Sequence, residues 1–244
     1  MRVAHAMILV LAAAVVCVAD TFAQPPAGED RAAAIKQALA ANQAALRQYT
    51  WVETKEITLK GEEKKKEQQQ CSYGADGKVQ KTPLAGAAPA AAPAKAQPDR
   101  GRRGSGKVKQ AIVANKIEDM KEYMEQVGAL VHQYVPPDAA KIQAAQSAGN
   151  VKAEPSQGIT ALNIVNYLKP GDLLAIGFDT AAKKITTFNV KSYVEKPKED
   201  DVTLSVTFAS LTDGTNYPEH VVLNVAAKQI AVTITNSGYK KIGS

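Results

Sequence analysis

Residues 101–108, GRRGSGKV, contain the spacing G-x-x-x-x-G-K, which is most of a phosphate-binding loop. Such a loop holds phosphates with its backbone N–H groups, and it needs a buried strand before it and a serine or threonine directly after the lysine to ligate magnesium. Here the preceding residues are of low complexity, and Val108 follows Lys107. The stretch therefore predicts a basic, flexible loop, and we expect no nucleotide to bind.

The other residues able to do acid–base, nucleophilic or metal chemistry are few and scattered. Beyond the first 23 residues, the chain has only His132, His220 and Cys71 of these types, and it lacks H-E-x-x-H, G-x-S-x-G and C-x-x-C. A zinc site needs three or four converging donors, and a nucleophile needs an adjacent base. The paired carboxylates Asp200 and Asp201 lie among lysines and predict a solvated turn. We predict no catalytic residue, no metal and no cofactor, and therefore a protein that is not an enzyme.

The single cysteine after residue 23 cannot form an internal disulfide. Cys71 lies in the polar run KKKEQQQCSYG, which predicts an exposed thiol. Two interpretations stay open, a contact in a dimer or an incidental residue, and nothing in the surrounding sequence predicts an activated thiolate.

The first residues, MRVAHAMILVLAAAVVCVADTFA, have the charged start, apolar run and small-residue end of a secretory signal peptide. We predict that residues 1–23 are removed and that residues 24–244 form one α+β domain. The alternative is that Cys17 carries a lipid, but Val16 stands where lipoprotein processing usually needs a small residue. No later segment is apolar enough to span a membrane. The sequence predicts export, to the periplasm, with peripheral association with the outer membrane as a further expectation.

The chain is basic, with a formal net charge of +6. Aromatic residues make up only 5% of the sequence, and no basic patch alternates with rings that could stack on bases. Together with export, this excludes a nucleic-acid partner. The charge instead predicts a weak attraction to anionic lipid surfaces.

The elements that would carry any site begin with an alanine-rich amphipathic helix over residues 29–49. The period then changes to two at YTWVETKEITLKG, which predicts a strand. The polar run after it predicts a strand at a wetted edge of the sheet, and GADGKVQKTPL predicts a turn and a short third strand. Residues 85–106, rich in alanine, proline, arginine and glycine, predict a flexible loop.

The clearest signal is a helix whose apolar residues recur at intervals of four and three from Val113 to Tyr134, before Pro136-Pro137 ends it. Packing against a sheet and pairing in a coiled coil both fit this pattern, and we expect the former. A shorter helix follows over residues 138–148, with Pro137 suited to its first turn. From GITALNIVNYL onward, short turns between alternating segments predict an antiparallel meander with one buried face. In VTLSVTFASL, Val202, Leu204, Val206 and Phe208 share one face.

This order of elements resembles the LolA-like superfamily of bacterial outer-membrane lipoprotein carriers. The most similar pieces are YPEHVVLNVAAKQIAVTITNSGYKKI and the strand YTWVETKEITLKG. The resemblance implies an incomplete β-barrel, a curved antiparallel sheet with an N-terminal helix and inserted helices packed on its concave face. The chain departs from the family in its insertion at residues 85–106.

The resemblance also implies an apolar cavity that binds lipid or lipoprotein acyl chains. We expect the long helix and the sheet to line it, through Trp51, Ile117, Met120, Met124, Val127, Val131, Leu204 and Phe208. The alternative is that these residues are ordinary core. The protein would then be an interaction module with a filled core and an envelope protein as its partner, similar to the periplasmic stress regulators that share this fold.

Overall fold

The computed structural model describes residues 40–84 and 105–243, without the side chains of residues 105–117 and 139. The predicted signal peptide, most of the predicted first helix and nearly all of the predicted loop 85–106 lie outside the described residues. Of the first helix, residues 40–46 are described and helical. No helix in the described part of the chain is both long enough and apolar enough to span a membrane.

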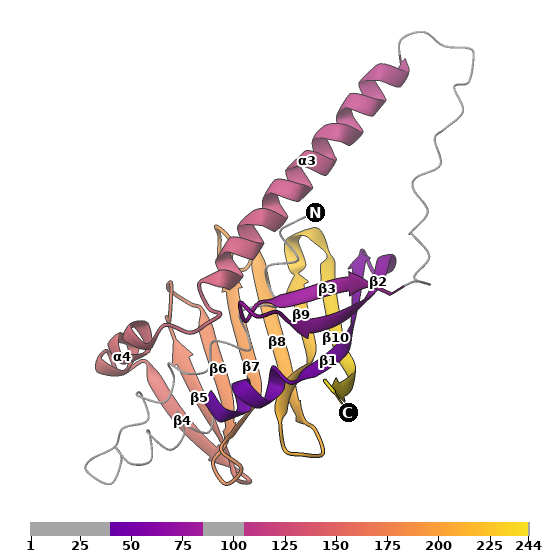
Figure 1. Cartoon of the computed structure of the whole chain (residues 1–244). Helices are drawn as coiled ribbons and strands as arrows, with labels where there is room; N and C mark the ends of the chain where they lie inside the picture. Colours follow the sequence, from indigo (N-terminus) through magenta and orange to yellow (C-terminus); the bar gives the residue numbers. More distant parts are fainter. Residues whose placement is uncertain (1–39, 85–104, 244) are drawn as a thin grey trace.

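The chain folds into an open sheet of ten strands, in the order β3-β2-β1-β10-β9-β8-β7-β6-β5-β4 (Figure 1). Neighbouring strands pair antiparallel. The strands are β1 (Tyr49–Leu59), β2 (Glu62–Tyr73), β3 (Val79–Pro83), β4 (Val151–Ser156), β5 (Ile159–Val165), β6 (Leu173–Asp179), β7 (Lys184–Tyr193), β8 (Asp201–Ser210), β9 (Asn216–Val225) and β10 (Ile230–Lys241). The predicted antiparallel α+β architecture is confirmed at this level.

The meander follows the alternation of its sequence. In β8, Val202, Leu204 and Val206 are buried, whereas Ser205 and Thr207 are exposed. Phe208, predicted on the same face, is only half-buried, because a register shift between β8 and β9 falls at Thr207/Phe208. Strand β4 was not predicted, since VKAEPS has one large apolar residue and a proline, which is tolerated at a sheet edge.

Strand β2 does not form the edge that its polar sequence predicts. It pairs with β1 on one side and with β3 on the other, so β3 is the edge strand.

The prediction of an exposed Cys71 is also wrong, because Cys71 is 0% exposed. Its side chain shares the inner face of the sheet with Trp51, which lies opposite it on β1. Alternation along β2 places this one thiol inward, although its sequence neighbours are polar.

Two helices follow β3 in the chain, α3 (Ser105–His132) and α4 (Ala139–Ser147). Val127, Leu130 and Val131 of α3 belong to one hydrophobic cluster with residues of β5 to β10. Figure 1 shows the ribbon of the N-terminal half of α3 extending past the sheet, so the predicted seam is seated only in its C-terminal part. The side chain of Asp138 caps α4, accepting hydrogen bonds from the N–H groups of Ala140 and Lys141.

The inner face of the sheet is not apolar throughout. Leu46, Tyr49, Trp51 and Cys71 are buried but lie outside the main cluster. Glu53, Lys55 and Asn236, which are also buried, share a face with Ile234 on the paired strands β1 and β10. A polar belt thus adjoins the main core at the β1 end of the sheet.

Candidate functional site

The structure divides the residues predicted to line an apolar cavity. Val127, Val131 and Leu204 are 0 to 2% exposed and lie within the main cluster. Met120, Met124 and Phe208 are half-buried and pack against it. Six of the eight predicted residues therefore meet at one core, and three of them form its border.

The other two predicted residues are not part of this group. Trp51 is buried but sits in an aromatic set with Tyr73 and Tyr239, and its ring stacks on that of Tyr239 with centroids 5.6 Å apart. Its Nε1 donates to Asn236 Oδ1 at 3.1 Å. The side chain of Ile117 lies outside the described residues. Trp51 thus faces the polar belt and the aromatic set instead of the α3 region.

The end of α3 is fixed to the sheet by a buried tyrosine. The hydroxyl of Tyr134 donates to Asp172 Oδ2 at 2.5 Å and lies 2.8 Å from Ser192 Oγ. All three side chains are at most 2% exposed. Burial, and then the hydrogen bond to Asp172, raise the pKa of Tyr134 well above its ordinary value. The hydroxyl therefore stays protonated and acts as a structural donor.

The two ends of the strands form two rims. The upper rim in Figure 1 contains the turns β7–β8 and β9–β10 and the beginning of β6, near Asp172. The ring of Tyr123 on α3 lies 4.9 Å from Lys228 Nζ in the β9–β10 turn, and Tyr134 reaches Asp172, so α3 follows this rim. The lower rim contains the turn β6–β7, the loop β8–β9 and the beginning of β1.

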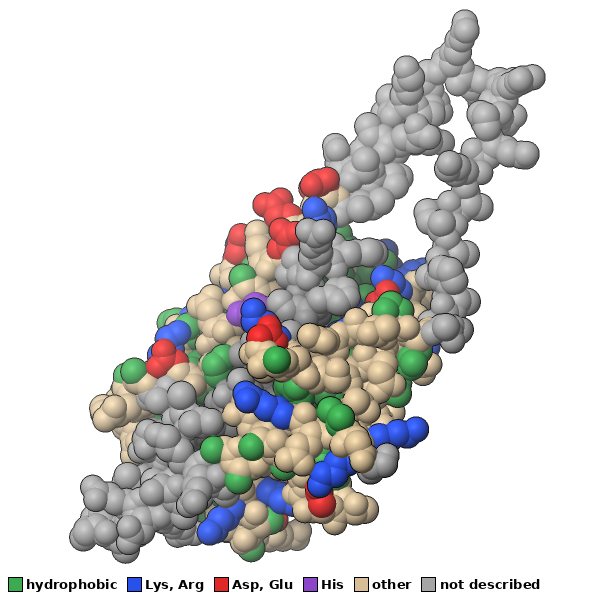
Figure 2. Space-filling model, in the orientation of Figure 1, with side chains coloured by type: hydrophobic (Ala, Val, Ile, Leu, Met, Phe, Trp, Pro, Cys, Tyr) green, Lys and Arg blue, Asp and Glu red, His purple; other side chains and the backbone are tan. Residues whose placement is uncertain are grey.

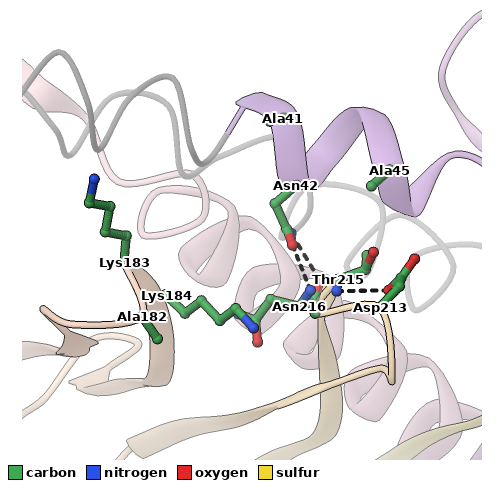
Figure 3. Close-up of a pocket in the computed structure, with 10 residues that line it drawn as sticks. Ala41, Asn42, Ala45, Ala182, Lys183, Lys184, Asp213, Thr215 and Asn216 are labelled. Carbon is green, nitrogen blue, oxygen red and sulfur yellow. Dashed lines mark hydrogen bonds between the residues drawn. The ribbon is translucent and has the colours of Figure 1, made fainter.

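A pocket of about 250 Å³ lies at the lower rim (Figure 3). Its walls come from the helical residues 40–46, the β6–β7 turn and the β8–β9 loop. The lining residues are Ala41, Asn42, Ala45, Ala182, Lys183, Lys184, Asp213, Gly214, Thr215 and Asn216. We refer to it as the rim pocket.

The rim pocket is hollow because small residues face one another across it. Ala41 and Ala45 are four apart, so they lie on the same side of the helical turn, and Ala182 and Gly214 line other parts of the wall. Asn42 holds this helix to the loop, since its Nδ2 donates to the carbonyl of Asn216 at 3.0 Å and its Oδ1 accepts from Asn216 N at 2.5 Å. Two hydrogen bonds therefore set the spacing between helix and loop, and no side chain of the described residues fills it.

The carboxylate in the pocket wall is already satisfied by the protein. Asp213 Oδ2 accepts a hydrogen bond from the Tyr49 hydroxyl at 2.5 Å, and Oδ1 accepts from Thr215 N at 2.9 Å. These hydrogen bonds, that of Tyr49 first, lower the pKa of Asp213 to about 2. Asp213 is thus an ionised structural group with no proton to give at neutral pH.

The two lysines in the pocket are placed differently. Lys184 Nζ donates to Ser210 Oγ at 2.9 Å. Figure 3 shows the Lys184 side chain running towards Thr215 and Asn216, whereas Lys183 points away from them. Neither lysine has an ion-pair partner among the residues that the structure describes.

No local sequence pattern predicts the rim pocket. The sequence analysis predicts only short turns at the β6–β7 and β8–β9 connections, and the pairing of Asn42 with Asn216 joins residues 174 positions apart. Among the described residues no group of three or more histidine, cysteine, aspartate or glutamate side chains could hold a metal ion. The thiol of Cys71 is not activated either, because burial raises its pKa to about 12.

Comparison with known proteins found no match to a family model, to a curated protein or to a solved structure. The resemblance to lipoprotein carriers therefore stays a prediction from the sequence.

Proposed function

We propose that this protein is an exported, non-enzymatic binding protein that takes an apolar ligand, such as a lipid or lipoprotein acyl chain, between α3 and the sheet. The main observation that supports this proposal is that the apolar side chains of α3 become less buried towards its N-terminus. Val127 and Val131 are fully buried, whereas Met120 and Met124, towards the extended half of the helix, are half-buried against the same core. Flexible thioethers adapt to different apolar partners, so a ligand can be accommodated there while the buried end of α3 stays in place.

The sheet offers apolar surface on the same side. Ile57 and Leu59 of β1 are half-buried against the main core. Leu59 pairs with Ile230, and Lys228, two residues before Ile230, contacts the Tyr123 ring of α3. The half-buried apolar side chains of α3 and β1 thus border the same rim. These apolar side chains could pack against a linear hydrocarbon chain.

The proposed setting is the periplasm, with peripheral association with the outer membrane. The predicted signal peptide supports export, and the net charge of +6 supports weak attraction to anionic lipids. Such attraction would bring the protein close to a surface that contains acyl chains.

A second function is favoured by a different observation. Val127, Val131 and Leu204, which were predicted to line a cavity, are buried in the main core. A filled core of this kind suits a protein–protein interaction module of the cell envelope with no lipid ligand. The two proposals differ in whether an acyl species travels with the protein.

Native mass spectrometry of protein purified without detergent tests the first proposal. We expect an adduct of acyl-chain mass that organic extraction removes. Met124→Asp should reduce the adduct at least tenfold, because it places a charge in the apolar border. Glu125→Ala, a change at the adjacent exposed position, should leave it unchanged. A clean apo mass for the wild-type protein contradicts the carrier and favours the interaction module.

A further inference from the structure

The lining of the rim pocket contains two lysines and one carboxylate, so positive charge is in excess. Asp213, its single carboxylate, has both oxygens occupied by Tyr49 and Thr215. Lys184 is half-buried and donates to a neutral hydroxyl, and no described carboxylate lies within ion-pair distance of it. An ammonium that faces a pocket and has no described counter-ion attracts an anion.

The other hydrogen-bonding groups around Lys184 are held in place by hydrogen bonds within the protein. The Asn42 amide has two N–H donors, and the one hydrogen bond it donates goes to the carbonyl of Asn216. The loop beside it is held by hydrogen bonds from Leu211 N to Thr215 O at 2.8 Å and from Gly214 N to Leu211 O at 2.9 Å. A ligand therefore meets a preformed wall instead of one that must be ordered on binding.

We propose that the rim pocket binds a small molecule that carries a carboxylate or a phosphate group, with the anion held by Lys184 and the rest of the molecule against Asn42 and the alanines. The volume, about 250 Å³, is below the usual range for drug-sized ligands, so the ligand is small. This site is at the rim opposite α3, and it does not depend on the proposed acyl-chain site. It is a second binding function of the same fold.

The test is a titration of the full chain, labelled with ¹⁵N, with sodium acetate and with inorganic phosphate at constant ionic strength. We expect saturable shifts of the amide signals of Ala182, Gly214 and Thr215. Saturation by acetate alone assigns a carboxylate ligand, by phosphate alone a phosphate ligand, and by both the shared anionic group. Shifts that sodium chloride reproduces, or that do not saturate, overturn the proposal.

Two variants and a control make the test specific. Lys184→Gln should weaken binding at least tenfold, while Lys152→Gln, at an exposed position on the edge strand β4, should change it less than twofold. Ala45→Leu should fill the pocket and abolish saturation with the folded spectrum retained. If Ala45→Leu or Lys184→Gln binds like the wild-type protein, the site is elsewhere and the proposal fails. An acyl adduct that persists in Lys184→Gln shows that the two sites are separate.

Discussion

Two side chains with polar or reactive atoms, those of Cys71 and Tyr134, are buried in the folded protein. Cys71 follows a run of lysine, glutamate and glutamine, yet its side chain is fully buried. Tyr134 is also fully buried, and its hydroxyl donates a hydrogen bond to the carboxylate of Asp172. In both residues the polar or reactive atom lies in the protein interior. Each therefore has a consequence that can be measured at one residue.

Cys71 should be unreactive in the folded protein. Burial raises the pKa of its thiol to about 12, so almost no thiolate exists at pH 8. In the full chain with Cys17→Ser, we expect Ellman's reagent to modify Cys71 at least a hundredfold more slowly in buffer than in guanidinium chloride. Equal rates in the two solvents would show that the thiol is exposed.

Removing the Tyr134 hydroxyl should destabilise the fold. Tyr134→Phe removes one of the three hydrogen bonds that Asp172 Oδ2 accepts, the other two coming from the N–H groups of Leu168 and Lys169. Losing a buried hydrogen-bond partner costs about 1–3 kcal/mol. Urea unfolding followed by circular dichroism measures this loss. The matched control is Tyr193→Phe, because the Tyr193 hydroxyl donates to the carbonyl of Pro170 in an exposed position, and we expect a change within about 0.5 kcal/mol. Equal losses in both variants would mean that Tyr134 does not anchor α3.

Peripheral elements of secondary structure are joined to the sheet by a few part-buried polar contacts. The edge strand β3 is short, and its Lys81 Nζ lies 2.7 Å from both carboxylate oxygens of Glu53 on β1. The helical residues 40–46 depend in the same way on Asn42, and the β8–β9 loop depends on Asp213. These contacts link the peripheral elements to the sheet.

The Glu53–Lys81 pair should behave as a buried ion pair. Lys81→Met strands the carboxylate of Glu53, which is 2% exposed, and breaking such a pair costs about 3–5 kcal/mol. The double variant Glu53→Gln/Lys81→Met should recover most of this loss, because no uncompensated charge remains. A double-mutant cycle from urea unfolding gives the coupling energy. Additive losses would contradict a direct interaction.

The β8–β9 loop should make stability depend on acid pH. The folded-state pKa of Asp213 is lowered, so its contribution is fully present above its ordinary pKa of 3.8 and is lost as the pH falls towards about 2. We expect the melting temperature of the wild-type protein to drop more steeply between pH 4 and pH 2 than that of Asp213→Asn. Parallel curves for the two proteins would exclude this role for Asp213.

The whole molecule is built around one main cluster that contains residues of α3, α4 and β5 to β10. Through β10, this cluster is continuous with β1, which carries Trp51, the only tryptophan of the chain. Figure 2 shows most of the visible acidic side chains near the α3 end, and more lysine or arginine than acidic side chains towards the opposite end.

A single cooperative unfolding transition should follow from this arrangement. Trp51 fluorescence reports on the β1 end of the sheet, and ellipticity at 222 nm reports mainly on the helices. We expect both signals to give the same midpoint in urea, because β10 is shared by the two regions. An earlier midpoint for the fluorescence signal would divide the protein into two units at the polar belt.

The sequence by itself determined the local elements. Alternation of apolar residues predicted β5 to β10, and the four-three spacing with Pro136-Pro137 predicted α3 and its end, because these signals depend on residues close in the chain. It also predicted the group of apolar residues on α3 and β8 that meet at the core.

Only the tertiary structure decided which side chains that are distant in sequence come together. The rim pocket, the buried Glu53–Lys81 pair, the Tyr134–Asp172 anchor and the interior position of Cys71 all depend on contacts between separate elements. No local period encodes such contacts, since they join residues that are far apart in the chain. The sequence therefore predicted most of the strands and helices, but not β4, while the polar contacts that define the candidate sites depend on the fold.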